Sequence, residues 1–196
     1  MLAYIWKKLF NMSGWKTGGS MPEDIKKCIV VAAPHTSNWD FFYARATAYI
    51  FNIKVNYLIK SDWLVFPLSY FFRKTGAIAV ERKKNTKGLV DKLVEKINQV
   101  DELAIIVAPE GTRKAVERWK TGFYQLALQA NLPIALSYLD YAKKEAGIGL
   151  IIYPSGNYYG DLYKMQEFYN TITPKFPKNY NINILPEFEF DKQLDI

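Results

Sequence analysis

The residues with the clearest capacity for chemistry lie in the stretch "VAAPHTSNWDFF", residues 31 to 42. It contains His35, the only histidine among 196 residues, and Asp40 follows five positions later. An imidazole can take a proton from a hydroxyl group, while a carboxylate on its other nitrogen fixes the tautomer and stabilises the charged ring. Because this spacing puts Asp40 in the first turn of a predicted helix, its carboxylate can reach back to His35. The pair alone leaves two interpretations open: a catalytic base with its orienting acid, or a polar strand end.

The stretch "IIVAPEGTRK", residues 105 to 114, carries a second set of reactive groups at the end of an apolar run. Gly111 lacks a Cβ, so the backbone of this loop can approach a ligand closely. Beside it, Glu110 supplies a carboxylate, Thr112 a hydroxyl group and Arg113 a planar fork for a phosphate or carboxylate. Taken alone, these residues also fit a glycine turn with an arginine on the surface.

Further cations follow other predicted strands. Lys60 comes directly after "VNYLI", and Arg82 ends the stretch "GAIAVER". Lys120 lies just before a predicted helix start, where backbone N–H groups and the helix dipole favour anions. In open α/β sheets, ligands bind outside the carboxyl ends of the strands. These cations are therefore expected to meet the acid–base pair, a composition that suits a hydroxyl nucleophile beside a phosphate.

The elements that must position these groups are short apolar runs that alternate with helical patterns. The predicted strands are 28 to 33, 55 to 59, 77 to 80, 103 to 108, 133 to 138 and 148 to 153. The predicted helices lie near 38 to 52, 62 to 73, 86 to 99, 121 to 130 and 160 to 171. Strands that are apolar throughout and separated by helices indicate a sheet covered on both faces. The short connection from 138 to 148 favours an antiparallel hairpin. We therefore predict one α/β domain, residues 1 to 196, with a mainly parallel or mixed sheet of about six to seven strands flanked by helices.

Both ends of the chain are expected to contact this domain or its surroundings. Residues 1 to 20 begin with a predicted short amphipathic helix, whose apolar face and flanking lysines are Leu2, Ile5, Trp6, Leu9, Lys7 and Lys8. Such a helix can lie on an anionic membrane surface, or it can cap the domain. The proline-containing tail, residues 173 to 196, is expected to pack back onto the domain.

The positive charge is concentrated in two segments of the chain. The net charge is +7, with seven basic and two acidic residues between 73 and 92 and four basic and one acidic between 113 and 120. Such focusing indicates an anionic partner, such as phosphate groups, an anionic lipid surface or nucleic acid. A solvated basic face is the alternative interpretation.

The single cysteine, Cys28, excludes an intrachain disulfide and any site built from several thiolates. With only one histidine as well, no metal site is expected. No apolar run approaches the roughly 18 residues needed to span a bilayer. Lys7 and Lys8 interrupt what would have to be the apolar part of a signal peptide. We therefore expect no transmembrane helix and no secretion.

Six short motifs, in order, resemble those of the glycerolipid acyltransferases of the 1-acylglycerol-3-phosphate (lysophosphatidic acid) type. The resemblance covers roughly residues 25 to 140. The motifs are the H-x4-D pair of His35 and Asp40, "KSDWLVFP" from Lys60 to Pro67, "GAIAVER" from Gly76 to Arg82, "PEGTR" from Pro109 to Arg113, "WKTG" from Trp119 to Gly122, and "LPI" from Leu132 to Ile134. Their order and spacing are far more specific than any one of them.

The resemblance implies transfer of a fatty acyl group from a thioester, acyl-CoA or acyl carrier protein, to the hydroxyl of a lysophospholipid. His35 would be the general base, and Asp40 its orienting partner. The residues implied to bind the acceptor's phosphate and glycerol are Arg82, Glu110, Gly111, Thr112 and Arg113, with Lys60 and Lys120 as further anion contacts. No acyl-enzyme is required, in agreement with the absence of a G-x-S-x-G nucleophile motif.

The resemblance also implies the partners and place of the protein. No cofactor is expected beyond acyl-CoA or acyl carrier protein as co-substrate, and no nucleic acid. An anionic membrane surface is the expected contact, with the protein cytoplasmic and peripheral to the inner membrane face. Two other functions remain open: a non-catalytic protein that binds anionic lipid or nucleic acid, and a thioester hydrolase that uses water at the same His35 and Asp40.

Overall fold

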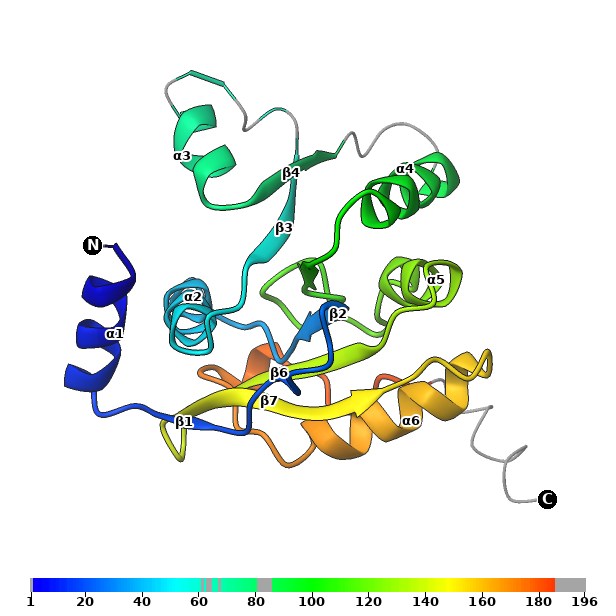
Figure 1. Ribbon diagram of the computed structural model, residues 1–196. Coiled ribbons are helices and arrows are strands. Elements are labelled where there is room, and N and C mark those ends of the chain that lie inside the picture. Colours follow the sequence, from blue (N-terminus) through cyan, green and yellow to red (C-terminus); the bar gives the residue numbers. More distant parts are fainter. Residues whose placement is uncertain (1, 61, 63–64, 67, 81–85, 186–196) are drawn as a thin grey trace.

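The computed structural model describes residues 2–60, 62, 65–66, 68–80 and 86–185. These residues form one mixed sheet with helices on both of its faces (Figure 1). The strands are β1 (Lys16–Gly18), β2 (Lys27–Ala32), β3 (Val55–Lys60), β4 (Ala77–Val80), β5 (Leu103–Val107), β6 (Ile134–Asp140) and β7 (Glu145–Ile152). The helices are α1 (Leu2–Met12), α2 (Trp39–Ile50), α3 (Leu68–Lys74), α4 (Thr86–Asn98), α5 (Gly122–Gln129) and α6 (Tyr158–Tyr169), with a 3₁₀ turn η2 (Pro177–Asn179). The α/β prediction is confirmed.

The seven strands lie in the order β1-β7-β6-β2-β5-β3-β4. All neighbouring strands are parallel except β6 and β7, which pair antiparallel from Ile134 opposite Ile152 to Asp140 opposite Glu145. The predicted hairpin and the mixed sheet are therefore confirmed. The short strand β1, which pairs with the start of β7, was not predicted, because three mostly exposed residues carry no apolar pattern.

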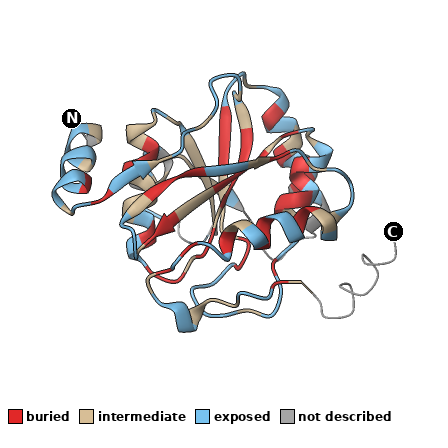
Figure 2. Cartoon of the chain, turned by 90° about the horizontal axis from the view of Figure 1, so that it is seen from below, coloured by how far each residue is buried: buried red, intermediate tan, exposed pale blue. Residues whose placement is uncertain are grey.

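Successive side chains of β2 are buried on opposite faces of the sheet. Ile29 and Val31 are fully buried in the cluster that α4, α5 and α6 cover. Cys28 and Val30 point to the other face, where they lie in one cluster with Phe51 and Ile53, just after α2. Because successive side chains of a strand point to opposite faces, a strand covered on both sides is apolar throughout. Burial concentrates on the central strands and on the inward faces of the helices (Figure 2).

The two loops singled out in the sequence leave the sheet side by side. β2 and β5 are adjacent and parallel, with Val31 opposite Val107. The loop 33–38 therefore follows β2 at the same edge as the loop 109–120 that follows β5. This arrangement brings His35 and Glu110 together although 75 residues separate them.

The N-terminal helix α1 packs on α2 through part of its apolar side. The Trp6 ring lies 5.0 Å from that of Phe42, and Phe10 is buried beside Trp15. Ile5 of the predicted apolar face is instead 45% exposed, and so is Leu9. The helix thus caps the domain with one side and presents apolar residues outward with another, and most of it is exposed in Figure 2.

The described part of the tail, up to Leu185, lies against the domain. The Phe176 N–H donates to the Thr36 hydroxyl at 3.2 Å, and the Ile184 N–H donates to the Gln166 side-chain oxygen at 2.8 Å. Ile184 is 1% exposed. Residues 186 to 196 lie outside the described residues. Within the described part of the chain, none of the helices has both the length and the apolar character that a membrane span requires.

Candidate active site

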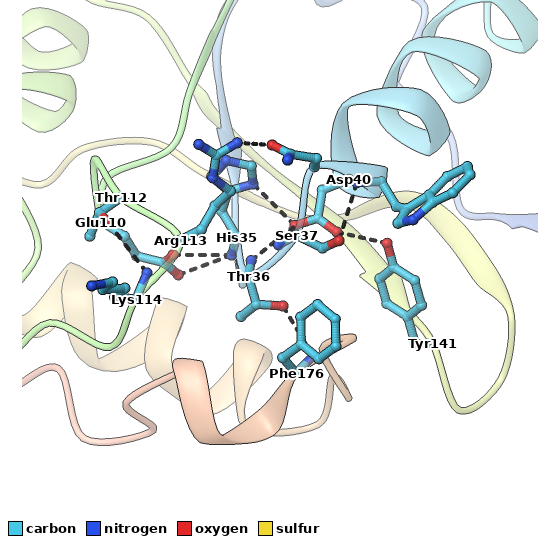
Figure 3. A network of polar contacts seen from close by, with 12 residues as sticks. His35, Thr36, Ser37, Asp40, Glu110, Thr112, Arg113, Lys114, Tyr141 and Phe176 are labelled. Atoms are coloured by element: carbon cyan, nitrogen blue, oxygen red, sulfur yellow. Dashed lines mark hydrogen bonds and ion pairs between the residues drawn. The ribbon is translucent and has the colours of Figure 1, made fainter.

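His35 and Asp40 form the contact that their spacing predicts. His35 Nδ1 lies 3.1 Å from Asp40 Oδ2 (Figure 3). His35 sits in the loop between β2 and α2, and Asp40 is in the first turn of α2. The side chain of His35 is 28% exposed and that of Asp40 is 7% exposed. The carboxylate is thus held inside while the ring keeps access to an incoming substrate.

The Asp40 carboxylate is held by four hydrogen-bonding partners. Its Oδ2 accepts from the backbone N–H groups of Thr36 and Ser37, both at 2.9 Å, in addition to facing His35. Its Oδ1 accepts from the hydroxyl of Tyr141 at 2.7 Å. A carboxylate that accepts this many hydrogen bonds is fixed in orientation and stabilised in its charged form.

The hydrogen bonds decide the protonation state of Asp40. Burial alone would raise the pKa of Asp40, but hydrogen bonds from His35, Tyr141 and Ser37 outweigh it and hold the pKa below its ordinary value. Asp40 is therefore ionised at neutral pH. An ionised carboxylate on Nδ1 leaves Nε2 as the proton acceptor and stabilises the imidazolium once it forms.

The hydroxyls of Ser37 and Thr36 have different partners at the start of α2. The Ser37 hydroxyl accepts from the N–H of Trp39, the first residue of α2, at 3.2 Å. The Thr36 hydroxyl accepts from the Phe176 N–H of the tail. Thr36 thus links two segments: its backbone N–H donates to Asp40, and its hydroxyl holds the tail.

Glu110 contacts His35 through the backbone. Both oxygens of its carboxyl group accept from the His35 N–H, at 3.2 Å and 3.1 Å, and Glu110 is only 4% exposed. Burial raises the pKa of Glu110 to about 8; the hydrogen bond from His35 partly opposes this and the charge of Asp40 adds to it. The side chain thus fixes the backbone that carries the imidazole, a contact that the sequence pattern does not reveal.

The Glu110 carboxyl should make stability pH-dependent. Burial raises the pKa of Glu110 from 4.5 to about 8, so between these pH values the folded chain binds more protons than the unfolded chain. The free energy of unfolding therefore falls as the pH rises through this range. The Glu110→Gln substitution should remove this dependence of stability on pH. At pH 9, the free energy of unfolding of the variant should be about 2 to 4 kcal/mol higher than that of wild type. Urea unfolding at pH 5, 7 and 9 measures it, with the exposed Glu102→Gln as control. A slope equal in wild type and Glu110→Gln would contradict the assignment.

The rest of the 109–120 loop carries the predicted cations Lys120 and Arg113. The Lys120 N–H donates to the Pro109 carbonyl at 2.9 Å, which closes the loop. Gly111 has φ +67, and a Cβ there would overlap the Lys120 side chain. The guanidinium of Arg113 donates to the side-chain oxygen of Asn38, next to the start of α2. Glycine at position 111 therefore lets the Lys120 side chain lie across the loop.

The other predicted site residues are placed less fully. Thr112 is exposed, and its hydroxyl accepts from the Lys114 N–H at 3.4 Å. Lys60 is the last residue of β3, at the carboxyl edge of the sheet as predicted. Arg82 lies outside the described residues. Four of the predicted groups, His35, Asp40, Glu110 and Arg113, are thus brought together within one network (Figure 3).

A cavity of about 260 Å³ runs from this network between α2 and the sheet. His35 and Asp40 line one part of it, and among the described residues Arg45 is the other charged side chain in its lining. Most of the remaining lining is apolar and includes Val30, Phe41, Ala44, Ala48, Phe51, Ile53, Val55, Leu58, Ile106 and Ile148. The arrangement can hold an apolar chain with one end at the imidazole. Among the described residues, no three His, Cys, Asp or Glu side chains gather as metal ligands would.

Sequence reasoning missed Tyr141. It lies 101 residues from Asp40 along the chain, so no local spacing relates them. Its only signal is its position, directly after β6 in the hairpin, near the edge of the sheet where the site lies.

Comparisons with known proteins agree with the fold and the motifs. A family model described as Acyltransferase matches residues 19–139. Among solved structures, the chain is similar to the 1-acyl-sn-glycerophosphate (LPA) acyltransferase PlsC from Thermotoga maritima, with a TM-score of 0.56 and 17% sequence identity over 85% of this chain and 73% of that chain. No curated protein matches the chain by sequence.

Proposed function

The chain belongs to the acyltransferase family, and from this premise we propose that it transfers a fatty acyl group from a thioester to the hydroxyl of a lysophospholipid such as 1-acylglycerol-3-phosphate. The donor is acyl-CoA or an acyl carrier protein, acting as co-substrate with no further cofactor. His35 is the general base, and Asp40 orients it.

The proposed reaction is a direct displacement. The acceptor hydroxyl gives its proton to Nε2 of His35 while its oxygen attacks the carbonyl carbon of the thioester. The C–S bond then breaks, and the imidazolium returns the proton to the leaving thiolate, so a new ester and a free thiol form. Asp40, ionised beside Nδ1 at 3.1 Å, stabilises the imidazolium between these steps.

The observation that carries the proposal is the position of the catalytic pair at the apolar cavity. The same cavity is lined by His35 and Asp40 and by apolar residues of α2 and the sheet. A thioester whose hydrocarbon chain lies in the cavity has its reactive carbonyl near the imidazole. An apolar cavity gives no binding energy to a small polar substrate, whereas it binds a hydrocarbon chain, so it favours a fatty acyl donor.

Cations next to the pair support an anionic acceptor. Arg113 and Lys120 are both exposed on the 109–120 loop, whose Glu110 holds the backbone of His35. A guanidinium is suited to bidentate binding of a phosphate, and an ammonium adds a point charge beside it. A phosphate bound there leaves the glycerol hydroxyl of the acceptor within reach of Nε2. Arg82, Thr112 and Lys60 complete this proposed set.

The outer side of α1 supports attachment to an anionic membrane surface, where a lysophospholipid acceptor resides. Tyr4, Ile5, Leu9 and Met12 are 71%, 45%, 45% and 73% exposed. The lysines of the same helix, Lys7 and Lys8, are exposed as well. Apolar side chains flanked by lysines are typical of helices that lie in the interface of a membrane.

A larger side chain at Ala48 should change the preferred length of the acyl chain. Ala48 is 8% exposed on α2 and lines the cavity. Because Ala48→Phe fills part of the space for the hydrocarbon, kcat/KM should fall about tenfold or more for long-chain donors. Short-chain donors should be affected less than twofold and serve as the internal control. An equal fall in kcat/KM for donors of all chain lengths would mean that the hydrocarbon chain of the donor does not occupy this cavity.

Acceptor-dependent thiol release tests the proposal as a whole. Purified protein is mixed with a long-chain acyl-CoA or acyl carrier protein, with and without lysophosphatidate in vesicles containing anionic lipid. The proposal predicts thiol release that requires the acceptor. Release of thiol without any acceptor would identify a thioester hydrolase, and absence of release with every donor and acceptor would favour the binding-only alternative.

A further inference from the structure

Tyr141 lies outside the segment that the family model matches and outside every motif recognised in the sequence. Its hydroxyl nevertheless ends directly on the catalytic pair, donating to Oδ1 of Asp40 at 2.7 Å. His35 and Tyr141 reach the carboxylate from opposite sides (Figure 3). The contact joins the hairpin between β6 and β7 to the loop between β2 and α2.

The two oxygens of the Asp40 carboxylate are held by different parts of the chain. Oδ2, which faces His35, is fixed by the backbone N–H groups of Thr36 and Ser37. Among the described residues, Oδ1 accepts a hydrogen bond from Tyr141 alone. Rotation of the carboxylate about its own axis would turn Oδ2 away from Nδ1, and the Tyr141 hydroxyl opposes this rotation at Oδ1 as the two backbone N–H groups do at Oδ2.

The ring of Tyr141 is itself fixed by its surroundings. It meets the Trp15 ring edge to face at 4.9 Å and the Tyr43 ring at 6.0 Å, and the ammonium of Lys175 lies 5.7 Å from its centre. Its backbone N–H donates to the Thr173 carbonyl at 2.9 Å. Packing on several sides leaves the phenol little freedom, so its hydroxyl is held in place before any substrate binds.

The turn that carries Tyr141 is equally constrained. The preceding residue, Asp140, accepts from the N–H groups of Ala142 and Lys143 at 3.0 Å each. Lys143 Nζ also pairs with Asp140 Oδ2 at 3.1 Å. Burial and the hydrogen bond to Asp40 raise the pKa of Tyr141, so the phenol remains a donor throughout the range in which the enzyme would work.

We propose that Tyr141 is a positioning residue for the His35–Asp40 pair, whose hydroxyl keeps the Asp40 carboxylate directed at Nδ1 and so keeps Nε2 of His35 unprotonated and ready. The inference rests on the proposed function for its catalytic consequence. Its structural content, a fixed tautomer of His35, stands independently of any substrate.

Tyr141→Phe tests the proposal, because phenylalanine keeps the ring and removes only the hydroxyl. We expect kcat to fall about tenfold to a hundredfold, the effect of losing one hydrogen bond to a charged group, with KM for the donor changed less than about twofold. When Asp40→Asn is already present, adding Tyr141→Phe should lower kcat little further, because both substitutions act through the contact between Tyr141 and Asp40.

Tyr124→Phe is the matched control. The Tyr124 hydroxyl donates to a carboxylate oxygen of Asp161 at 2.9 Å, and both residues are buried away from the catalytic pair. Removing it should lower the melting temperature at least as much as Tyr141→Phe and leave kcat unchanged. If both variants lose the same activity, or if Tyr141→Phe retains kcat within twofold, the positioning role is wrong.

A spectroscopic readout separates this inference from the proposed function. Because His35 is the only histidine, ¹⁵N labelling of histidine gives one pair of ring signals. Wild type and Tyr124→Phe should show the tautomer with a proton on Nδ1, and Tyr141→Phe should show a mixture of both tautomers. Identical spectra in all three would overturn the inference even for an active enzyme. A change of tautomer confined to Tyr141→Phe would uphold the inference even if no acyl transfer were found.

Discussion

Replacing His35 with alanine is expected to lower kcat for acyl transfer by about 10²- to 10⁴-fold, the range that general-base catalysis supplies. In the proposed reaction no other group near the acceptor hydroxyl takes its proton: Asp40 is buried behind the ring and faces its far nitrogen. The KM for the donor should change little, because the hydrocarbon chain is held by the cavity and not by the imidazole. Steady-state kinetics with lysophosphatidate as acceptor measure both values.

The fold of His35→Ala should be retained. The side chain is 28% exposed, and among the described residues its ring has a polar contact with Asp40 alone, so its loss leaves no large cavity in the core. A melting temperature within a few degrees of wild type is the control. Added imidazole should restore part of the activity by occupying the vacated space. Wild-type rates in a folded His35→Ala variant would contradict the assignment of the base.

Asp40→Asn is the second substitution with a large expected effect. Asparagine keeps the size of the side chain but removes the charge that stabilises the imidazolium, and its NH2 group takes the place of an oxygen that accepts hydrogen bonds. We expect kcat to fall by about 10²-fold or more, with little change in KM. In Asp40→Asn, the fall in kcat should be accompanied by a change in the tautomer of His35.

Asp161→Asn is the matched control for this change. Asp161 is fully buried, accepts from the Ser155 N–H and the Tyr124 hydroxyl, and has a pKa that these hydrogen bonds hold below its ordinary value despite burial. Its replacement should lower stability in the same way while leaving kcat unchanged. Equal activity losses in Asp40→Asn and Asp161→Asn would mean that Asp40 acts only through the fold.

Local patterns explain how far the sequence alone could predict this molecule. The strand β2 is apolar along nearly all of its length because both of its faces are covered, and the continuous apolar run "CIVVAA" predicts such a strand. The contact of His35 with Asp40 depends on five residues of backbone, so spacing and a helix start were enough to predict it. The shared edge of the two loops follows from the parallel pairing of β2 and β5.

Contacts between distant segments could not be predicted in this way. Glu110 carries a carboxylate in a motif that suggests an exposed ligand contact, yet it is buried against the His35 backbone. Tyr141 meets Asp40 only because the β6–β7 hairpin ends beside α2. The apolar side of α1 is divided between the domain and its exposed surface, and spacing alone does not determine which residue faces which way.

The most direct test of the account identifies the product of a single reaction mixture by mass spectrometry. Wild-type protein, a long-chain acyl thioester and lysophosphatidate are incubated together, and ester product, free thiol and free fatty acid are quantified. The account predicts one new diacyl ester for each thiol released, and neither in His35→Ala. Thiol released together with free fatty acid and no ester, or ester formed equally well by His35→Ala, would contradict it.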